Sequence, residues 1–219
     1  MDNLVKICGL STPETLDAAL SAGADMVGFV RFPKSPRHVS LNLGHKLSLQ
    51  AKGRAQRVVL LVNPGDEDIA QAVEAINPDL IQLHGSESPA RVAEIRSMVK
   101  RPVMKALGVA EPSDLQALTP YADADHILLD AKPPRTAEAL PGGNGVSFDW
   151  RLLNGLDRKV SFMLSGGLNP DNVAEAIRLT KPRAVDVSSG VETGPGLKDP
   201  ARIEAFIRAA RTAFAAAHH

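Results

Sequence analysis

The chain has 219 residues, of which 44% are hydrophobic, and its 25 Lys and Arg side chains balance its 25 Asp and Glu side chains. Such a chain can bury a substantial core, but its charge balance gives no electrostatic case for binding nucleic acid or an anionic membrane. Its single cysteine excludes an intramolecular disulfide and favours a reducing compartment. We find neither a signal peptide nor an apolar run of the ~20 residues that a membrane span needs, so we expect a cytoplasmic globular protein.

Eight short apolar runs of strand length recur along the chain. The steps between their last residues are 22, 32, 22, 23, 23, 35 and 23 residues, so five of the seven nearly agree. Runs of this length bounded by turn signals are consistent with buried strands. The predicted strands span residues 4–8, 26–30, 57–62, 80–84, 103–107, 126–130, 161–165 and 184–188.

Segments between these runs have the period of amphipathic helices. Apolar residues recur at helical spacing within residues 69–76, 92–99 and 203–214. A capping residue followed by proline marks a helix start, because the cap accepts from an orphan backbone N–H and proline lacks a donor where none is needed. The sequence predicts four such starts, at Thr12-Pro13, Ser88-Pro89, Asn169-Pro170 and Asp199-Pro200.

The alternation of strand and helix predicts an α/β fold. Repeated strand–helix units favour parallel strands joined by crossover helices. Eight units suit a closed (β/α)₈ barrel, the TIM barrel. A doubly wound open sheet is the alternative, but eight even units are many for it and no G-x-G-x-x-G follows the first strand. Because we see no linker or low-complexity stretch, we predict one domain over residues 1–219.

The ends of the predicted strands carry unusually polar residues. In a (β/α)₈ barrel the active site is built at the C-terminal ends of the strands, and long loops without periodicity are usually functional or disordered. The two long steps contain such loops, at residues 31–42 and 131–147. We therefore expect the site on this face, near the strand-end residues Cys8, His84, Asp130 and Asp186.

Alternation along the strands places charged residues inside the predicted barrel. Side chains two residues apart point to the same side of a strand, so Lys6 shares a face with Cys8. Lys105 in the fifth strand and Asp186 in the eighth are also candidates for the interior. A buried charge must pair or incur a large desolvation cost. We expect Asp186 to neutralise an interior lysine.

Glycine-rich stretches follow the sixth, seventh and eighth predicted strands. They cover residues 142–145, 165–170 and 188–196. Glycine lets backbone N–H groups approach an anion closely, and a helix N-terminus adds a favourable dipole. Barrels of this type often bind phosphate at the loops after strands 7 and 8. Three adjacent glycine-rich strand ends therefore predict a phosphate site.

Cys8, the only cysteine, ends the first predicted strand and faces this phosphate site. A small buried hydrophobe is the ordinary role of such a residue. A thiol can also act as a general base if its pKa is lowered, since at the free value of ~8.5 only about 3% is thiolate at pH 7. Asp130, three strands away around the ring, could be the acid if partial burial keeps its carboxyl protonated. The two residues then form an acid–base pair that flanks one substrate.

An ordered set of motifs now makes the chain recognisable. The motifs KICGL (6–10), FVRFPKSPRHVS (29–40), IQLHG (81–85), ILLDAKPP (127–134), GGNGVSFDW (142–150), LSGGLNPDNV (164–173) and AVDVSSGVETGPGLKD (184–199) run through most strand ends. Together they resemble the phosphoribosylanthranilate isomerase family of tryptophan biosynthesis. The resemblance implies an Amadori rearrangement of N-(5′-phosphoribosyl)anthranilate to 1-(2-carboxyphenylamino)-1-deoxyribulose 5-phosphate. It also implies that no metal or organic cofactor takes part, because the nitrogen of the substrate is the electron sink.

The resemblance also assigns roles to individual residues. It implies that Asp130 protonates the ribose ring oxygen and that Cys8 removes the C2′ proton from the resulting Schiff base. Arg37 matches the arginine that faces the anthranilate carboxylate, which a guanidinium can grip bidentately. His84 is either a site-lining neighbour or a satisfied structural histidine. The phosphate contacts carry over to Gly166, Gly167, Ser188, Ser189 and Gly190, with Gly143 and Gly145 in support, and Asp186 takes a structural or polarising role.

Other functions stay open at this point. Another barrel acting on a phosphosugar is one, such as a histidine-pathway isomerase, an indoleglycerol-phosphate synthase or a ribulose-phosphate epimerase. A metalloenzyme is a second, although no H-x-H or H-x-x-x-H spacing supports it. A non-catalytic barrel that binds phosphorylated anions is a third. We expect a small phosphorylated substrate as the partner, and a monomer rather than a homodimer.

Overall fold

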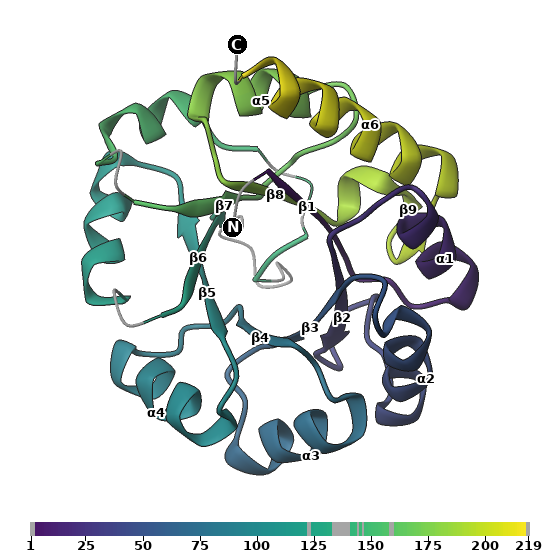
Figure 1. Ribbon diagram of the computed structural model, residues 1–219. Helices are drawn as coiled ribbons and strands as arrows, with labels where there is room; N and C mark the ends of the chain where they lie inside the picture. The colour runs from purple at the N-terminus through teal and green to yellow at the C-terminus, as the bar shows by residue number, and fades with distance from the viewer. Residues whose placement is uncertain are drawn as a thin grey trace.

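The closed barrel that the sequence predicts is confirmed. A computed structural model describes residues 3–121, 124–132, 141–143, 145, 147–157 and 160–217. Within them, parallel strands form a closed ring in chain order, because β1 pairs with both β2 and β8 (Figure 1). This closure excludes the open doubly wound sheet. The strands are β1 (Leu4–Cys8), β2 (Met26–Arg31), β3 (Gln56–Leu61), β4 (Leu80–Leu83), β5 (Val103–Val109), β6 (His126–Ala131), β7 (Phe162–Leu164) and β8 (Ala184–Val187).

Helices surround the barrel and connect its strands (Figure 1). The three segments predicted from apolar periodicity lie within α3, α4 and α6. Among the described residues, the crossovers after β5 and β6 contain 3₁₀ helices and no α-helix. The helices are α1 (Pro13–Ser21), α2 (Leu41–Ala51), α3 (Asp66–Ile76), α4 (Pro89–Val99), η1 (Pro112–Tyr121), η2 (Trp150–Gly155), α5 (Val173–Thr180), η3 (Ser189–Val191) and α6 (Pro200–Ala216).

Three of the four predicted helix starts are confirmed. The side chains of Thr12, Ser88 and Asp199 accept hydrogen bonds from backbone N–H groups in the first turns of α1, α4 and α6. The fourth, at Asn169-Pro170, is wrong, because α5 begins three residues later, at Val173. The Asn169 side chain accepts instead from the backbone N–H groups of Asp171 and Asn172, at 2.9 and 3.1 Å. Asparagine often closes a local turn of this kind in competition with a helix.

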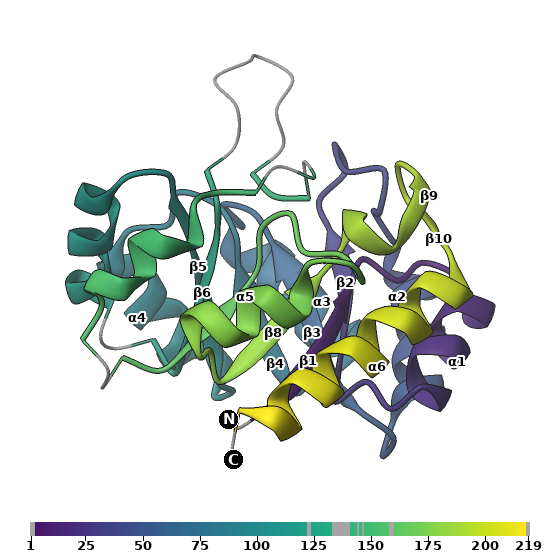
Figure 2. The same ribbon diagram turned by 90° about the horizontal axis from the view of Figure 1, so that it is seen from above.

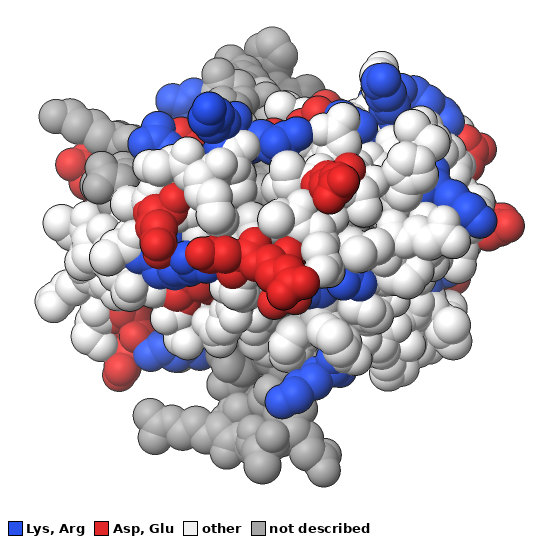
Figure 3. Space-filling model, turned by 90° about the horizontal axis from the view of Figure 1, so that it is seen from below, with Lys and Arg blue, Asp and Glu red and all other residues white. Residues whose placement is uncertain are grey.

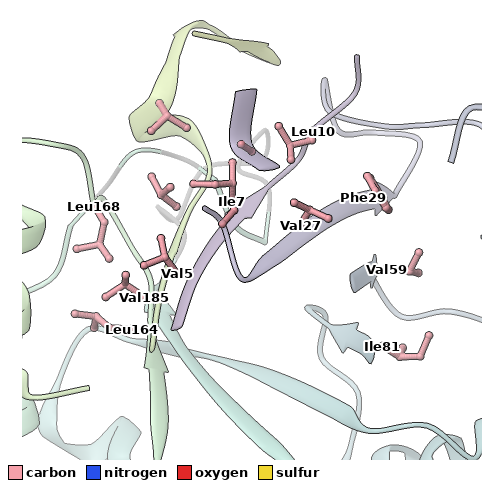
Figure 4. Close-up of a cluster of buried hydrophobic side chains, with 14 of the residues drawn as sticks. Val5, Ile7, Leu10, Val27, Phe29, Val59, Ile81, Leu164, Leu168 and Val185 are labelled. Carbon is pink, nitrogen blue, oxygen red and sulfur yellow. The ribbon is translucent and has the colours of Figure 1, made fainter. Parts of the chain in front are cut away.

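Two apolar layers hold the barrel together. Side chains that point outward from the strands pack under the helices, and Figure 4 shows part of this outer layer, with Val5 and Ile7 of β1 beside Val27 and Phe29 of β2. A smaller inner layer fills the barrel and is made of Met26, Val58, Leu80, Met104, Ala106, Leu128, Met163 and Ala184. These apolar side chains share the barrel interior with the buried Lys6 and Asp186.

The predicted charged interior is confirmed for Lys6 and Asp186. Lys6 is fully buried, and its Nζ donates to Asp186 Oδ1 at 2.9 Å. Burial opposes the charge on Lys6, but Asp186 and Cys8 outweigh it and raise the pKa of the ammonium.

The prediction for Lys105 is wrong. In β5, Met104 and Ala106 belong to the inner layer, so Lys105 lies on the outer face with Val103 and Val109. It is buried there and pairs at 2.7 Å with Glu87, which lies in the loop before α4.

The surface gives no sign of a membrane span. In the described ranges, no helix combines the length and the apolar character needed to cross a bilayer. On the face seen in Figure 3, Lys and Arg side chains are interspersed with Asp and Glu side chains. Figure 2 shows the start of β1 and the end of α6 at one end of the barrel, and the β9–β10 hairpin (Glu192–Gly194 and Leu197–Lys198) at the other.

Candidate active site

A pocket of about 770 Å³, counting its open mouth, lies at the C-terminal ends of the strands. Eleven of the predicted site residues line it, and they come from most of the strand ends around the ring. These residues are Cys8, Arg37, His84, Asp130, Gly143, Gly145, Gly166, Gly167, Asp186, Ser188 and Ser189. The fold therefore brings together residues that are distant in the chain.

Cys8 is a buried free thiol at the end of β1. Gly28 on the neighbouring strand makes room for it, since a Cβ there would lie 2.9 Å from the sulfur. Burial raises the pKa of the Cys8 thiol, and the repulsion of Asp186 adds to this, although Lys6 and Lys198 oppose it. The sequence analysis requires a lowered thiol pKa for a general base, and the structure gives a raised one instead. In this pocket the neutral thiol is the favoured form.

Asp130 is buried near the end of β6, where two contacts hold its carboxyl. Oδ1 accepts from the backbone N–H of Ala131 at 2.8 Å, and Oδ2 lies 3.1 Å from Nε2 of His84. Gly142 packs against this pair, since a Cβ there would lie 2.7 Å from His84 Nε2 and 2.9 Å from Asp130 Oδ2. The carboxyl thus has a fixed orientation at the pocket wall.

His84 connects Asp130 to the barrel interior. Its Nδ1 lies 3.2 Å from the amide nitrogen of Gln82, which is fully buried two residues earlier in β4. With the amide N–H facing Nδ1, the His84 proton is on Nε2, which then donates to the Asp130 carboxylate. The Gln82 Oε1 atom is buried without a hydrogen-bond partner among the described residues. His84 is therefore both a pocket-lining residue and a partner of the predicted acid.

Arg37, in the loop between β2 and α2, is buried and firmly held. Its Nε and Nη2 donate to the two carboxylate oxygens of Glu192, each at 2.8 Å, and Nη2 also donates to the Gly143 carbonyl at 3.2 Å. Arg37 is therefore not a solvated loop arginine. The sequence analysis missed Glu192 and its second partner Lys198. Both lie in the last recognised motif, where two opposite charges in a glycine-rich segment were the available signal.

The predicted phosphate side of the pocket is formed by the loops after β7 and β8. Gly166 and Gly167 both have positive φ, at 88° and 63°, which glycine adopts without strain. Ser188 and Ser189 lie at the start of η3, and Lys198 Nζ donates to the Ser188 carbonyl at 2.8 Å. Gly190 is the one predicted site residue that does not line the pocket. A Cβ there would lie 1.8 Å from the Leu168 carbonyl oxygen, so Gly190 packs the two loops together.

Among the described residues, no group of three or more His, Cys, Asp or Glu side chains is arranged to hold a metal ion.

The predicted long loop after β6 is described only in part, because residues 133–140, 144 and 146 lie outside the described residues.

Comparison with known proteins decides the family. The sequence model of the family described as N-(5′-phosphoribosyl)anthranilate (PRA) isomerase matches residues 5–209. The chain belongs to the PRA isomerase family. It is 59% identical over 213 residues to the N-(5′-phosphoribosyl)anthranilate isomerase of Azorhizobium caulinodans, a match that covers 97% of this chain and 93% of that protein. The resemblance read from the sequence is thereby confirmed.

Solved structures of PRA isomerases have the same fold. One, of mutually generated monomers of the dimeric enzyme from Thermotoga maritima, matches with a TM-score of 0.83 and 37% identity, over 97% of this chain and all of that one. Another is a complex with reduced 1-(o-carboxyphenylamino)-1-deoxyribulose 5-phosphate, with a TM-score of 0.84, 37% identity and the same coverage. This chain is thus an isomerase of tryptophan biosynthesis with a TIM-barrel fold. The other phosphosugar barrels and the non-catalytic barrel are set aside.

Proposed function

We propose that this PRA isomerase converts N-(5′-phosphoribosyl)anthranilate into 1-(2-carboxyphenylamino)-1-deoxyribulose 5-phosphate, with Cys8 as general base and Asp130 as general acid. One observation carries the assignment. The thiol and the carboxyl line the same pocket, from strands β1 and β6, which are separated by β7 and β8 around the ring. Groups on two sides of one cavity can exchange protons with two different atoms of a substrate.

The acid step opens the ribose ring. Asp130 gives its proton to the ring oxygen while the bond from that oxygen to C1′ breaks, and the nitrogen lone pair forms a protonated Schiff base. A protonated Asp130 could donate to His84 Nε2 if His84 carried its own proton on Nδ1. After turning its amide, Gln82 would accept a hydrogen bond from this Nδ1–H with its unpartnered oxygen. The His84–Gln82 chain can therefore support both protonation states of the acid.

The base step removes the proton from C2′. The electron pair of the C2′–H bond moves towards the cationic nitrogen, and the enolamine that forms tautomerises to the ketone. Burial disfavours the thiolate, but two positive charges oppose this effect at the moment of reaction. One is the ammonium of Lys6, which is buried in the barrel two residues before Cys8, and the other is the protonated Schiff base itself. The thiolate is thus stabilised most when the reaction needs it.

The two anionic ends of the substrate fit the remaining predicted residues. We propose that Arg37 binds the anthranilate carboxylate and that the loops after β7 and β8 bind the phosphate. Asp186 acts through Lys6, which it holds at 2.9 Å beneath the thiol. The proposed phosphate contacts are Gly166, Gly167, Ser188 and Ser189, with Gly143 and Gly145 in support. Gly190, also predicted as a contact, lies outside the pocket lining and packs the two loops together.

We further propose that residues 1–219 form one domain. The chain would act as a cytoplasmic monomer on its phosphorylated substrate, in contrast to the dimeric relative from Thermotoga maritima.

The proposed activity is tested by adding the protein to N-(5′-phosphoribosyl)anthranilate and following its fluorescence. We expect a rapid catalytic decay as the substrate is consumed, with the ketone product identified by mass and retention against a synthetic standard. The control is the double variant C8A/D130N at the same concentration. If the parent protein binds the reduced product analogue but leaves the substrate decay at its spontaneous rate, the proposed reaction is wrong.

The pH dependence of kcat/KM follows from the raised pKa of Cys8. The acid–base pair must hold one proton in total, on Asp130, while the thiol is ionised. A carboxyl ordinarily loses its proton far below a thiol, so the singly protonated pair dominates over the neutral range and its productive fraction is constant. We expect kcat/KM to be flat from about pH 6 to 9 and to fall about tenfold per unit above the raised pKa of the thiol, beyond the ordinary ~8.5. If kcat/KM instead increased with pH from about 6 to 9, the rate would depend on ionisation of the thiol alone, and Asp130 would not be the acid.

A further inference from the structure

A buried ion cluster lies in the β9–β10 hairpin, next to the loop after β2 (Figures 1 and 2). Glu192 and Lys198 come from the two strands of the hairpin, and both are buried together with Arg37. The proposed reaction uses Arg37 but assigns no role to the other two residues. Buried charges of this kind are poor stabilisers, because desolvation offsets their attraction. Their presence at the edge of a substrate pocket therefore calls for another explanation.

Glu192 sets the direction of the Arg37 guanidinium. Its carboxylate binds Nε and Nη2 in a bidentate arrangement, each at 2.8 Å. Among the described residues, Nη1 is then the guanidinium nitrogen with no protein acceptor, and it lies against Gly143 at the pocket wall. Burial by itself would raise the pKa of Glu192, but Arg37 and Lys198 hold it below its ordinary value. The carboxylate is therefore the favoured form of Glu192 at neutral pH.

Lys198 connects the same carboxylate to the phosphate side of the pocket. Its Nζ donates to Glu192 Oε1 at 2.6 Å and to the Ser188 carbonyl at 2.8 Å, and it lies 3.3 Å from the Ser188 hydroxyl. Burial lowers the pKa of Lys198, although the charge of Glu192 opposes this effect. Glu192 and Lys198 thus connect Arg37, proposed for the substrate carboxylate, to the Ser188 loop, proposed for its phosphate.

We propose that Glu192 and Lys198 are positioning residues that fix the distance between the two anion-binding ends of the site. Glu192 aims Arg37 at the anthranilate carboxylate, and Lys198 anchors the Ser188 loop for the phosphate. This inference rests on the proposed substrate, because it takes Arg37 as the carboxylate ligand. Glu192 then determines the selectivity for the carboxylated ring without contacting the ligand, because it acts through Arg37.

The test compares two ligands with and without the ring carboxylate. They are reduced 1-(2-carboxyphenylamino)-1-deoxyribulose 5-phosphate and its phenylamino counterpart, and calorimetry gives the Kd of each. For E192Q, which has nearly the same volume, we expect the carboxylated ligand to bind about 10- to 100-fold more weakly, the value of a charge-assisted hydrogen bond. The counterpart without the carboxylate should bind within threefold of the parent value. For K198M, both ligands should weaken by a similar factor, because both carry the phosphate.

Two further variants make the result decisive. T193A changes an exposed side chain of the same hairpin and should alter neither Kd. R37M should remove the preference for the carboxylated ligand, and adding E192Q to it should cause no further loss of that preference. Thermal unfolding of each variant checks the fold. Equal weakening of both ligands by E192Q, or an additive loss in the R37M/E192Q pair, would overturn the inference. These equilibrium results do not depend on Cys8 or Asp130, so they separate a failure of this inference from a failure of the proposed catalytic roles.

Discussion

Replacing Cys8 by alanine lowers kcat by about 10²- to 10⁴-fold, the usual contribution of a general base, with little change in KM. Alanine cannot accept a proton, and no other base ends β1 beside the Lys6 ammonium. The thiol is not among the groups proposed to bind either anionic end, so affinity for the substrate should persist. The loss of one small buried side chain next to Val30 and Leu60 should cost about 1 kcal/mol of stability and leave the fold intact.

The measurement is the initial rate of fluorescence decay at saturating substrate, with the Kd of the reduced product analogue as a check on binding. Cys8→Ser should be as inactive as alanine, because a hydroxyl holds its proton far more tightly than a thiol in the same buried place. The matched control is Ile7→Val, which removes a methylene from the neighbouring β1 residue that faces the outer layer. If C8A retains more than a tenth of the parental kcat while I7V behaves like the parent, Cys8 is not the base.

Much of the fold could be predicted because each strand end is marked locally. An apolar run followed by a polar residue or a glycine is visible in one sequence, and the period of two then places Lys6 and Cys8 on the same inner face. The pairing of Asp186 with an interior lysine follows from desolvation, since a buried charge needs a partner, and the structure shows that this lysine is Lys6. The error at Asn169 has an equally local cause. Capping a helix and closing a turn use the same asparagine oxygen, and only the tertiary fold decides between them.

Parts of the site could not be predicted, because they depend on contacts between loops. Nothing near Arg37 in the chain indicates that Glu192 would occupy two of its guanidinium nitrogens, and the two residues are 155 positions apart. The pKa of Cys8 has the same difficulty. The direction of the pKa shift depends on whether burial or the nearby cations dominate, and the sequence shows Lys6 but not how deeply Cys8 is buried. Strand periodicity predicts which side chains share a face, whereas a pKa shift depends on the distances between charged groups, which the sequence does not give.

Replacing Asp130 by asparagine lowers kcat by about 10²- to 10⁴-fold, because the amide cannot protonate the ribose ring oxygen. The asparagine carbonyl can still accept from the Ala131 N–H, and its amide can donate to Nε2 of the other His84 tautomer, so the local structure should be kept. The control is Asp125→Asn, the same change at the other end of β6, where the carboxylate pairs with Arg96 at 2.9 Å. That variant should lose stability in urea unfolding but keep its kcat.

The shape of the pH profile gives the sharper test of Asp130. In the parent enzyme, the need for a protonated acid cancels the need for a thiolate, and kcat/KM stays flat over the neutral range. Once the acid is removed by D130N, only the thiolate requirement is left. The residual kcat/KM should then rise about tenfold per pH unit towards the raised pKa of Cys8. A residual activity that stays flat with pH would mean that Asp130 and Cys8 do not share the proton on which this mechanism depends.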